Sequence, residues 1–134
     1  SMRNALAAIL LVAALLVAAC ATAPVEFRNE LLVDSKGMTL YTFDKDAAGS
    51  GKSVCNGSCA ALWPPLAAGK DDQASGVYSV ITRDDGARQW AYQGKPLYRW
   101  IKDTKPGDKT GDGFNNAWRV VGKAGTPGTP GKSY

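Results

Sequence analysis

The chain has 134 residues, with 16 Lys and Arg against 12 Asp and Glu, and its formal net charge is +4. The basic residues are scattered among acidic ones without forming a Lys/Arg block, so nothing indicates a nucleic-acid-binding surface. The chain contains no histidine. This absence excludes His-ligated zinc, haem attachment through C-x-x-C-H and any catalytic triad that uses histidine.

Residues 1–19 are predicted to form a signal peptide, with Ser1 treated as a cloning remnant in front of Met2. Arg3 provides a short positive region, and an unbroken run of Ala, Leu, Ile and Val extends from Ala5 to Ala19. A helix that spans a membrane needs about 20 apolar residues, so this run is too short. Its length and its flanks are typical of the apolar region of a secretory signal.

Cys20 directly follows the apolar run, which ends in V-A-A-C. A cysteine at this position resembles the lipobox of bacterial lipoproteins. The resemblance implies that the Cys20 thiol receives a diacylglycerol and anchors the chain stably in a membrane, with residues 20–26 as a tether. Because Ala21 rather than Asp comes next, it also favours the periplasmic face of the outer membrane in a host with two membranes. The alternative is a secreted protein with an unmodified cysteine.

Residues 27–121 have the length of one domain with one core. The segment 122–134 is rich in Gly and Pro and has almost no apolar side chains. Such a segment buries too little apolar surface to offset the entropy of ordering, so we predict a disordered tail.

Period-two alternation predicts a first β-hairpin. In residues 39–44 the aromatic Tyr41 and Phe43 fall on one side of the expected strand. The segment 30–34, which is apolar from Leu31 to Val33, precedes this strand across a short turn that contains Gly37. Together the two segments predict an antiparallel pair.

A second hairpin is predicted later in the chain, from strands over 89–92 and 97–101 and a turn at Gln93-Gly94. Another strand is expected over 77–82, joined to the next by a D-G turn that ends at Gly86.

One short helix is expected over 58–63, capped by Ser58 and ended by Pro64. The predicted fold is therefore mainly β, with antiparallel hairpins or a meander, two pseudo-symmetric repeats and one short helix.

The repeats, about 30–66 and 89–121, are visible in the sequence itself. Gly37 to Asp46 aligns without gaps with Gly94 to Asp103, and both segments contain Tyr-x-[Phe/Trp]-x-x-Asp. Each copy is followed by a Gly-rich charged loop and then by a tryptophan, Trp63 or Trp118. The residues of the repeated motif are Tyr41, Phe43, Asp46, Tyr98, Trp100 and Asp103.

Between Cys55 and Leu66 the chain reads C-x-G-x-C-A-x-x-W-P-P-L. Together with the repeated motif, this segment resembles the secreted-repeat lipoproteins, a family named for Y-x-(F/W/Y)-x-x-D. The resemblance extends over nearly the whole predicted mature domain and includes the cysteine after the signal. It implies an envelope lipoprotein of uncharacterised function.

Cys55 and Cys59 form C-N-G-S-C. In the oxidising compartment that an exported protein reaches, a pair this close is expected to form a disulfide. By loop-closure entropy such a small ring contributes roughly 2 kcal/mol, so the disulfide would hold a local turn. The alternative is a thiol pair with a redox or copper-handling role.

The aromatic residues near the motifs have two interpretations. Some of them could form a platform for a sugar or another flat ligand, and the candidates are Trp63, Trp90, Tyr92 and Trp118. The interpretation that we favour is that a small β domain uses these rings as its core.

The motif carboxylates Asp46 and Asp103 could bind a ligand or metal, but we expect them to accept N–H groups of the following loops. A weak calcium site is conceivable because Asp108, Thr110 and Asp112 have the oxygen-ligand spacing that begins a calcium loop. No Glu follows at the required distance, and two lysines lie in the loop.

No nucleophile–base pair or phosphate-binding loop can be assigned, so we expect no enzymatic activity and no cofactor. The favoured function is a membrane-anchored envelope lipoprotein whose domain binds a ligand or protein partner. The alternatives are a redox or metal-handling module built on Cys55, Cys59 and the Asp-rich loops, and a purely structural envelope component.

Overall fold

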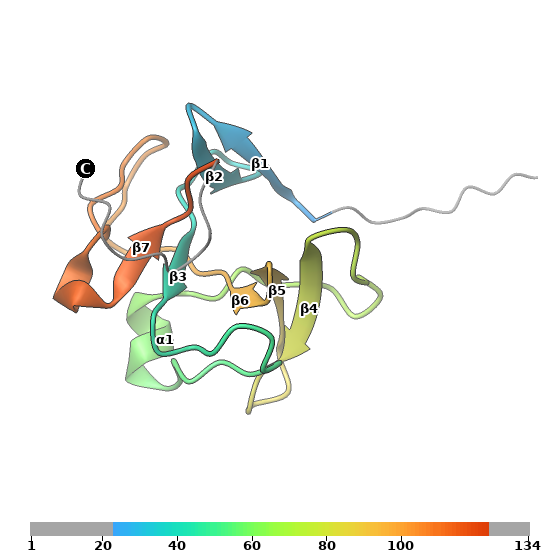
Figure 1. The fold of residues 1–134 in the computed structure, drawn as a ribbon. Helices are drawn as coiled ribbons and strands as arrows, with labels where there is room; N and C mark the ends of the chain where they lie inside the picture. The colour runs from blue at the N-terminus through green and yellow to red at the C-terminus, as the bar shows by residue number, and fades with distance from the viewer. Residues whose placement is uncertain (1–22, 124–134) are drawn as a thin grey trace, which may run out of the picture.

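The computed structural model describes residues 23–123, so the predicted signal peptide, Cys20 and most of the predicted tail lie outside the described residues. Within this range no helix is both long enough and apolar enough to cross a membrane. The described chain is mainly antiparallel β with one short α-helix, which confirms the predicted fold class (Figure 1). Its elements are β1 (Val25–Arg28), β2 (Leu31–Asp34), β3 (Tyr41–Phe43), α1 (Ser58–Leu62), β4 (Tyr78–Thr82), β5 (Arg88–Tyr92), β6 (Lys95–Pro96), the 3-10 helix η1 (Phe114–Asn116) and β7 (Trp118–Val120).

The strands form three small antiparallel sheets. β1 pairs with β2, β3 pairs with β7, and β4, β5 and β6 form a sheet in that order. The β3–β7 pair joins the two repeats, since Tyr41 lies opposite Val120 and Phe43 lies opposite Trp118. Figure 1 shows these two strands side by side although they come from opposite ends of the domain.

The repeats meet at equivalent tyrosines. The N–H of Tyr41 donates to the carbonyl of Tyr98 at 2.8 Å, and the N–H of Tyr98 donates to the carbonyl of Tyr41 at 2.9 Å. Tyr41 also pairs with Val120 of the second repeat, and Tyr98 with Pro65 of the first. Each motif strand therefore completes its hydrogen bonding with the segment that follows the tryptophan of the other repeat.

The first predicted hairpin and the β4–β5 hairpin are present. After β2, the N–H of Asp34 bonds to the carbonyl of Met38, and the Asp34 carboxylate accepts the N–H of Lys36 and of Met38. The turn needs a residue with positive φ, and Gly37 supplies it at +85°. β4 and β5 are joined across the predicted D-G turn, where the N–H of Arg83 donates to the carbonyl of Ala87.

The predicted strand over 97–101 is wrong. The strand that pairs with β5 on this side is β6, and the N–H of Leu97 extends the pairing by one bond, to the carbonyl of Trp90. The chain leaves β5 at this point because Tyr98 pairs with Tyr41 and Pro65 instead.

The alternation of residues 39–44 divides the core into two clusters. Tyr41 and Phe43 face one cluster and Leu40 faces the other, as period-two geometry requires. The first core cluster consists of Tyr41, Phe43, Cys55, Trp63, Tyr98, Trp100, Trp118 and Val120. The second core cluster consists of Leu32, Leu40, Leu66, Trp90, Tyr92, Leu97 and Val121. Both faces of the central strands are therefore covered.

At its N-terminal end the ordered domain is longer than the predicted 27–121. β1 begins at Val25, inside the segment 20–26 that the sequence suggested as a tether. The reason is that Val25 and Phe27 alternate toward the second core cluster, where burial of apolar surface stabilises the strand.

At the C-terminal end, Gly122 pairs with Leu31, and the N–H of Lys123 donates to the carbonyl of Glu30. The first two residues of the predicted disordered tail 122–134 thus continue the ladder beyond β7. The remainder of that segment lies outside the described residues.

The predicted helix is confirmed in position but not in its cap. α1 ends at Leu62, and Trp63 precedes the helix-breaking Pro64. Gly57, with φ of 60°, occupies the N-cap position, and no side chain caps the helix. The prediction that Ser58 is the cap is wrong, because Ser58 already lies inside the first turn.

Candidate functional site

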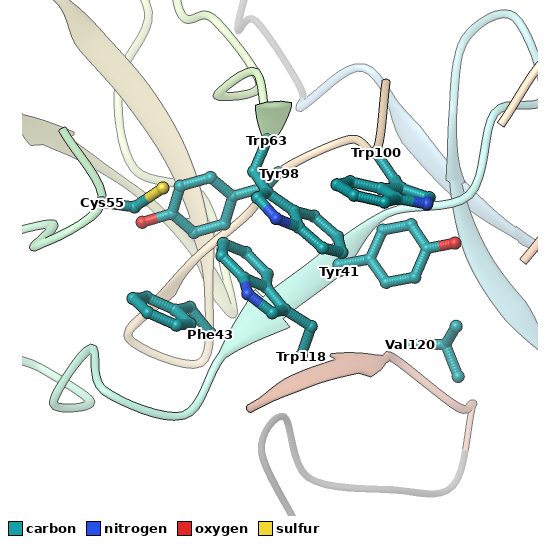
Figure 2. Close-up of a cluster of buried hydrophobic side chains, with 8 residues drawn as sticks. All are labelled: Tyr41, Phe43, Cys55, Trp63, Tyr98, Trp100, Trp118 and Val120. Carbon is teal, nitrogen blue, oxygen red and sulfur yellow. The ribbon is translucent and has the colours of Figure 1, made fainter. Parts of the chain in front are cut away.

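Four aromatic rings form a continuous stack in the first core cluster (Figure 2). At its centre the Trp63 and Trp118 rings are nearly parallel, with centroids 3.8 Å apart and an interplanar angle of 2°. Trp100 stacks on Trp63 at 4.0 Å, and Phe43 stacks on Trp118 at 4.2 Å. Each repeat contributes one motif aromatic and one tryptophan, so the stack follows the pseudo-symmetry of the sequence.

The motif tyrosines pack edge-on against the same two tryptophans. Tyr41 contacts Trp63 at a centroid distance of 5.3 Å and 80°, and Tyr98 contacts Trp118 at 5.1 Å and 87°. Edge-to-face contacts bring the positive ring edge onto the negative ring face, and each such pair contributes roughly 0.5–1.5 kcal/mol beyond its buried area. Every motif aromatic is therefore accounted for by packing in the core.

The motif aspartates accept hydrogen bonds from the tyrosines of the opposite repeat. The hydroxyl of Tyr41 donates to Asp103 Oδ2 at 2.6 Å, and that of Tyr98 donates to Asp46 Oδ2 at 2.5 Å. Burial raises the pKa of both tyrosines, and the hydrogen bond to the carboxylate raises it further. Burial also raises the pKa of Asp46, and the hydrogen bond from Tyr98 opposes that rise.

The second oxygen of each motif carboxylate holds the loop that follows it. Asp46 Oδ1 accepts the N–H of Val54 at 2.8 Å, and Asp103 Oδ1 accepts the N–H of Thr110 at 3.0 Å. The expectation that these aspartates accept loop N–H groups is confirmed. The motif Tyr-x-[Phe/Trp]-x-x-Asp thus joins the two repeats and fixes their loops.

The proposed platform of Trp63, Trp90, Tyr92 and Trp118 is wrong, because all four side chains are buried. Trp63 and Trp118 lie inside the stack, and the other two belong to the second core cluster. Alternation along a strand separates two faces but does not reveal that both of them are covered.

An open groove lies instead beside the outer end of the stack. It has a volume of about 610 Å³ and is lined by Leu62, Trp100, Lys102, Thr110 and Phe114. Leu62 and Phe114 are 44% and 38% exposed. We call this feature the aromatic groove.

Ile101 lies next to the aromatic groove and is 54% exposed, and its N–H donates to the carbonyl of Leu62 at 3.0 Å. Two of the five large apolar side chains exposed within residues 23–123 line this groove, Leu62 and Phe114. Neither Leu62 nor Phe114 was identified from the sequence. The only local signal for Phe114 is the following Asn-Asn pair, which adopts positive φ in η1 and turns the chain.

Residues 30–67 and 79–122 each match the family described as a secreted repeat of unknown function. The two matches together span more than half of the chain and confirm the two repeats. The chain belongs to this secreted-repeat family. No curated protein and no solved structure matches the chain.

The second family match begins in β4, earlier than the repeat boundary of about 89 expected from the sequence. The second match thus includes most of β4, which pairs with β5 in one hairpin. The first match begins at residue 30, after β1, so the family matches do not include β1.

The three residues of the weak calcium candidate, Asp108, Thr110 and Asp112, bond to different groups of the protein. Asp108 accepts the N–H of Thr104 and pairs with Lys105 at 2.8 Å, and these contacts lower its pKa to about 2. The hydroxyl of Thr110 donates to the motif carboxylate of its own repeat, and Asp112 accepts a strand N–H. Within residues 23–123 no group of three His, Cys, Asp or Glu residues is placed to hold a metal ion.

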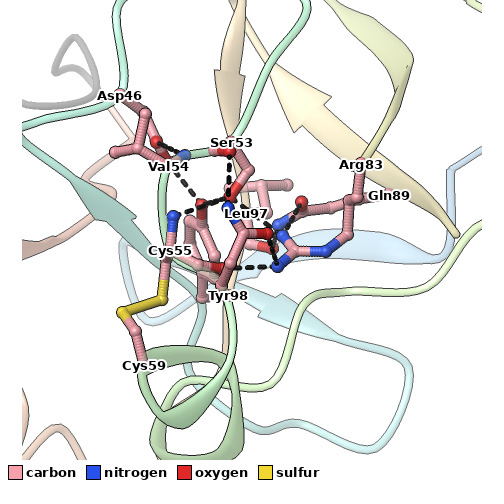
Figure 3. Close-up of a disulfide and its surroundings, with 10 residues drawn as sticks. Asp46, Ser53, Val54, Cys55, Cys59, Arg83, Gln89, Leu97 and Tyr98 are labelled. Carbon is pink, nitrogen blue, oxygen red and sulfur yellow. Dashed lines mark hydrogen bonds between the residues drawn. A yellow bond between two sulfur atoms is a disulfide. The ribbon is translucent and has the colours of Figure 1, made fainter. Parts of the chain in front are cut away.

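Cys55 and Cys59 form a disulfide, as predicted (Figure 3). Cys55 is buried in the first core cluster, and Cys59 packs against it. The disulfide therefore connects α1 to the same cluster that contains the aromatic stack.

A buried arginine ties the disulfide loop to the β4–β5 turn (Figure 3). The guanidinium of Arg83 donates from Nη1 to Ser53 Oγ at 2.9 Å and to Gln89 Oε1 at 2.7 Å. From Nη2 it donates to the carbonyl of Cys55 and to Asn56 Oδ1. Four uncharged acceptors satisfy this buried cation, which makes it a structural residue of the loop.

A second cavity, of about 520 Å³, lies between α1 and the β4–β5 turn. It is lined by the small side chains of Ala60, Ala67 and Ala87 and by charges of both signs, including Asp85 and Arg88. No aromatic side chain lines it. The aromatic groove therefore offers the better surface for an apolar or planar ligand.

Proposed function

We propose that this member of the secreted-repeat family is a lipid-anchored protein of the cell envelope whose domain binds a ligand in the aromatic groove and catalyses no reaction. The observation that carries the binding proposal is that the exposed side chains of Leu62 and Phe114 line one groove together with Trp100. Contiguous apolar side chains exposed to water are unfavourable unless something covers them, and such patches mark interaction sites.

The groove residues indicate the chemistry of the ligand. Trp100 and the more exposed Phe114 line the groove with aromatic side chains, and Lys102 adds a cation. Such a combination suits a planar or apolar group that carries an anionic substituent. The stack beneath Trp100 keeps this surface rigid, which reduces the entropy lost on binding.

The binding proposal can be tested with 1-anilinonaphthalene-8-sulfonate, an aromatic probe that carries one negative charge. We expect Phe114→Ala to weaken its binding by about tenfold, which corresponds to roughly 1.4 kcal/mol. Lys102→Gln should weaken binding less and reduce its dependence on salt.

Val54→Ser is the matched control, because Val54 is also a large exposed apolar residue but lies in the disulfide loop. It should bind the probe like the unmodified protein. Equal loss of binding in Val54→Ser and Phe114→Ala would contradict the assignment of the groove, as would unchanged binding in Phe114→Ala.

The anchoring part of the proposal is supported by the apolar run before Cys20 and by membership of a secreted family. In cells, the protein without substitutions should be recovered with the membrane fraction. Its mass should include the acyl chains on Cys20. Cys20→Ser should be recovered without lipid and free of the membrane. Fractionation that is unchanged by Cys20→Ser would overturn the lipid anchor.

A further inference from the structure

The chain enters the domain beside the second core cluster. Ala23, Val25 and Phe27 all pack against this cluster. Only three residue steps separate Cys20 from Ala23, and at 3.3–3.6 Å per residue they span about 11 Å at most. A lipid on Cys20 would therefore hold this edge of the domain within a short distance of the bilayer.

Half-exposed apolar and aromatic side chains surround this entry point. Tyr92 is buried between two rings, with Phe27 at 6.1 Å and Tyr78 at 5.4 Å. Both outer rings are only partly buried, and the adjacent Val77 is 49% exposed. Val77 is held against the end of β5, because its carbonyl accepts the N–H of Gln93 at 2.7 Å. We call Val25, Phe27, Val77 and Tyr78 the N-terminal rim.

The charges on β1 do not oppose contact between the N-terminal rim and a lipid surface. Glu26 and Arg28 alternate with the rim residues of the strand and pair with each other at 2.6 Å. The strand therefore carries no net charge. Figure 1 shows the start of β1 on the opposite side of the domain from α1, whose Leu62 lines the aromatic groove.

We propose that the N-terminal rim is the membrane-facing surface of the domain and rests in the headgroup region of the bilayer. This inference rests on the lipid anchor of the proposed function, since the anchor selects the bilayer as the surface within reach. Aromatic and apolar side chains are favoured at that depth, and tyrosine can direct its hydroxyl toward water. The aromatic groove then opens away from the membrane.

The experiment uses the mature chain from Cys20 coupled chemically to vesicles. With Cys55 and Cys59 in the disulfide, Cys20 provides the single free thiol, which can react with a maleimide phospholipid in phosphatidylcholine vesicles. Val77→Trp introduces a fluorescent reporter at the N-terminal rim, and brominated phosphatidylcholine quenches tryptophans that reach the bilayer. The native tryptophans are at most 6% exposed, so their emission can be subtracted with the parent protein.

Val54→Trp is the matched control, because Val54 is 55% exposed and lies near Arg83, beyond the far end of β4 from Tyr78. We expect the added emission of Val77→Trp to shift to shorter wavelength and to lose roughly half or more of its intensity in brominated vesicles. That of Val54→Trp should not change. Equal quenching of both reporters, or of neither, would overturn the proposal.

Gln93→Trp provides a second reporter beside Val77 if the first variant fails to fold, and the same outcomes apply to it. The chemical coupling keeps this test separate from the anchor itself. Absence of lipid on Cys20 in cells would overturn the proposed lipid anchor. Absence of quenching on the chemically coupled protein would overturn the proposal that the N-terminal rim faces the membrane.

Discussion

Tyr98→Phe removes one hydroxyl from the interface between the two repeats and leaves the ring in place. That hydroxyl donates to Asp46 Oδ2 at 2.5 Å and lies 2.6 Å from Ser53 Oγ. A hydrogen bond to a charged group contributes about 1.5–3 kcal/mol, and its loss leaves a buried carboxylate with one donor, the N–H of Val54. We expect a loss of about 2 kcal/mol in the free energy of unfolding, or roughly 10 °C in Tm for a domain of this size.

The loss should depend on pH in a defined direction. Burial raises the pKa of Asp46 in the folded state, so ionisation of this carboxyl opposes folding, fully above the folded-state pKa and not at all below the unfolded-state pKa. The Tyr98 hydrogen bond opposes the rise, so its removal raises the folded-state pKa further. The difference in the free energy of unfolding between Tyr98→Phe and the unmodified protein should therefore be largest at neutral pH. It should shrink as Asp46 becomes protonated in acid.

Urea denaturation at neutral and at acid pH measures both effects. Tyr78→Phe is the control, because the Tyr78 hydroxyl has no hydrogen-bond partner within residues 23–123, and its cost should be below about 0.5 kcal/mol. A double-mutant cycle with Asp46→Asn should give a coupling energy of about 1–3 kcal/mol. A cost no larger than that of the control, or a deficit that does not change with pH, would refute the reasoning.

Two further changes test the packing around the stack. Gly111→Ala places a Cβ 2.7 Å from Trp63 Cη2 and should lower the free energy of unfolding by about 1–3 kcal/mol in thermal or chemical denaturation. Gly122→Ala is the control, because a Cβ at Gly122 has no atom within 4 Å, and it should cost less than about 0.5 kcal/mol. Equal costs would show that the stack can move aside. Replacing Cys55 and Cys59 together by serine opens a ring with a sequence separation of 4 and should cost about 2 kcal/mol, as should reduction of the unmodified protein. A Tm that is insensitive to reductant would contradict this.

Much of the local structure follows from the sequence because short-range chemistry decides it. A glycine with positive φ was needed at Gly37, alternation placed Tyr41 and Leu40 on opposite faces, and Pro64 ended the helix. The proximity of Cys55 and Cys59 was enough to predict their pairing. Each of these predictions depends on residues within a few positions of one another.

The cap of α1 shows the limit of such reasoning. Ser58 is a favourable cap residue by type, but the helix begins one residue earlier in register than that role requires. Gly57 takes the position because its φ of 60° lets the chain enter the helix from the disulfide loop. Helix boundaries of this kind depend on the path of the preceding chain.

The sequence by itself determined that the domain consists of two related β units, each carrying Tyr-x-[Phe/Trp]-x-x-Asp. Only the tertiary structure decided that the tyrosine of each unit bonds to the aspartate of the other, and that Trp63 and Trp118 stack face to face between them. The physical reason is that these partners are far apart in the chain, and the repeat shows which residues are equivalent but not which of them touch. A repeat unit of this size cannot cover both faces of its own strands, so it buries its aromatic rings against its counterpart and leaves Phe114 exposed at the edge of the stack.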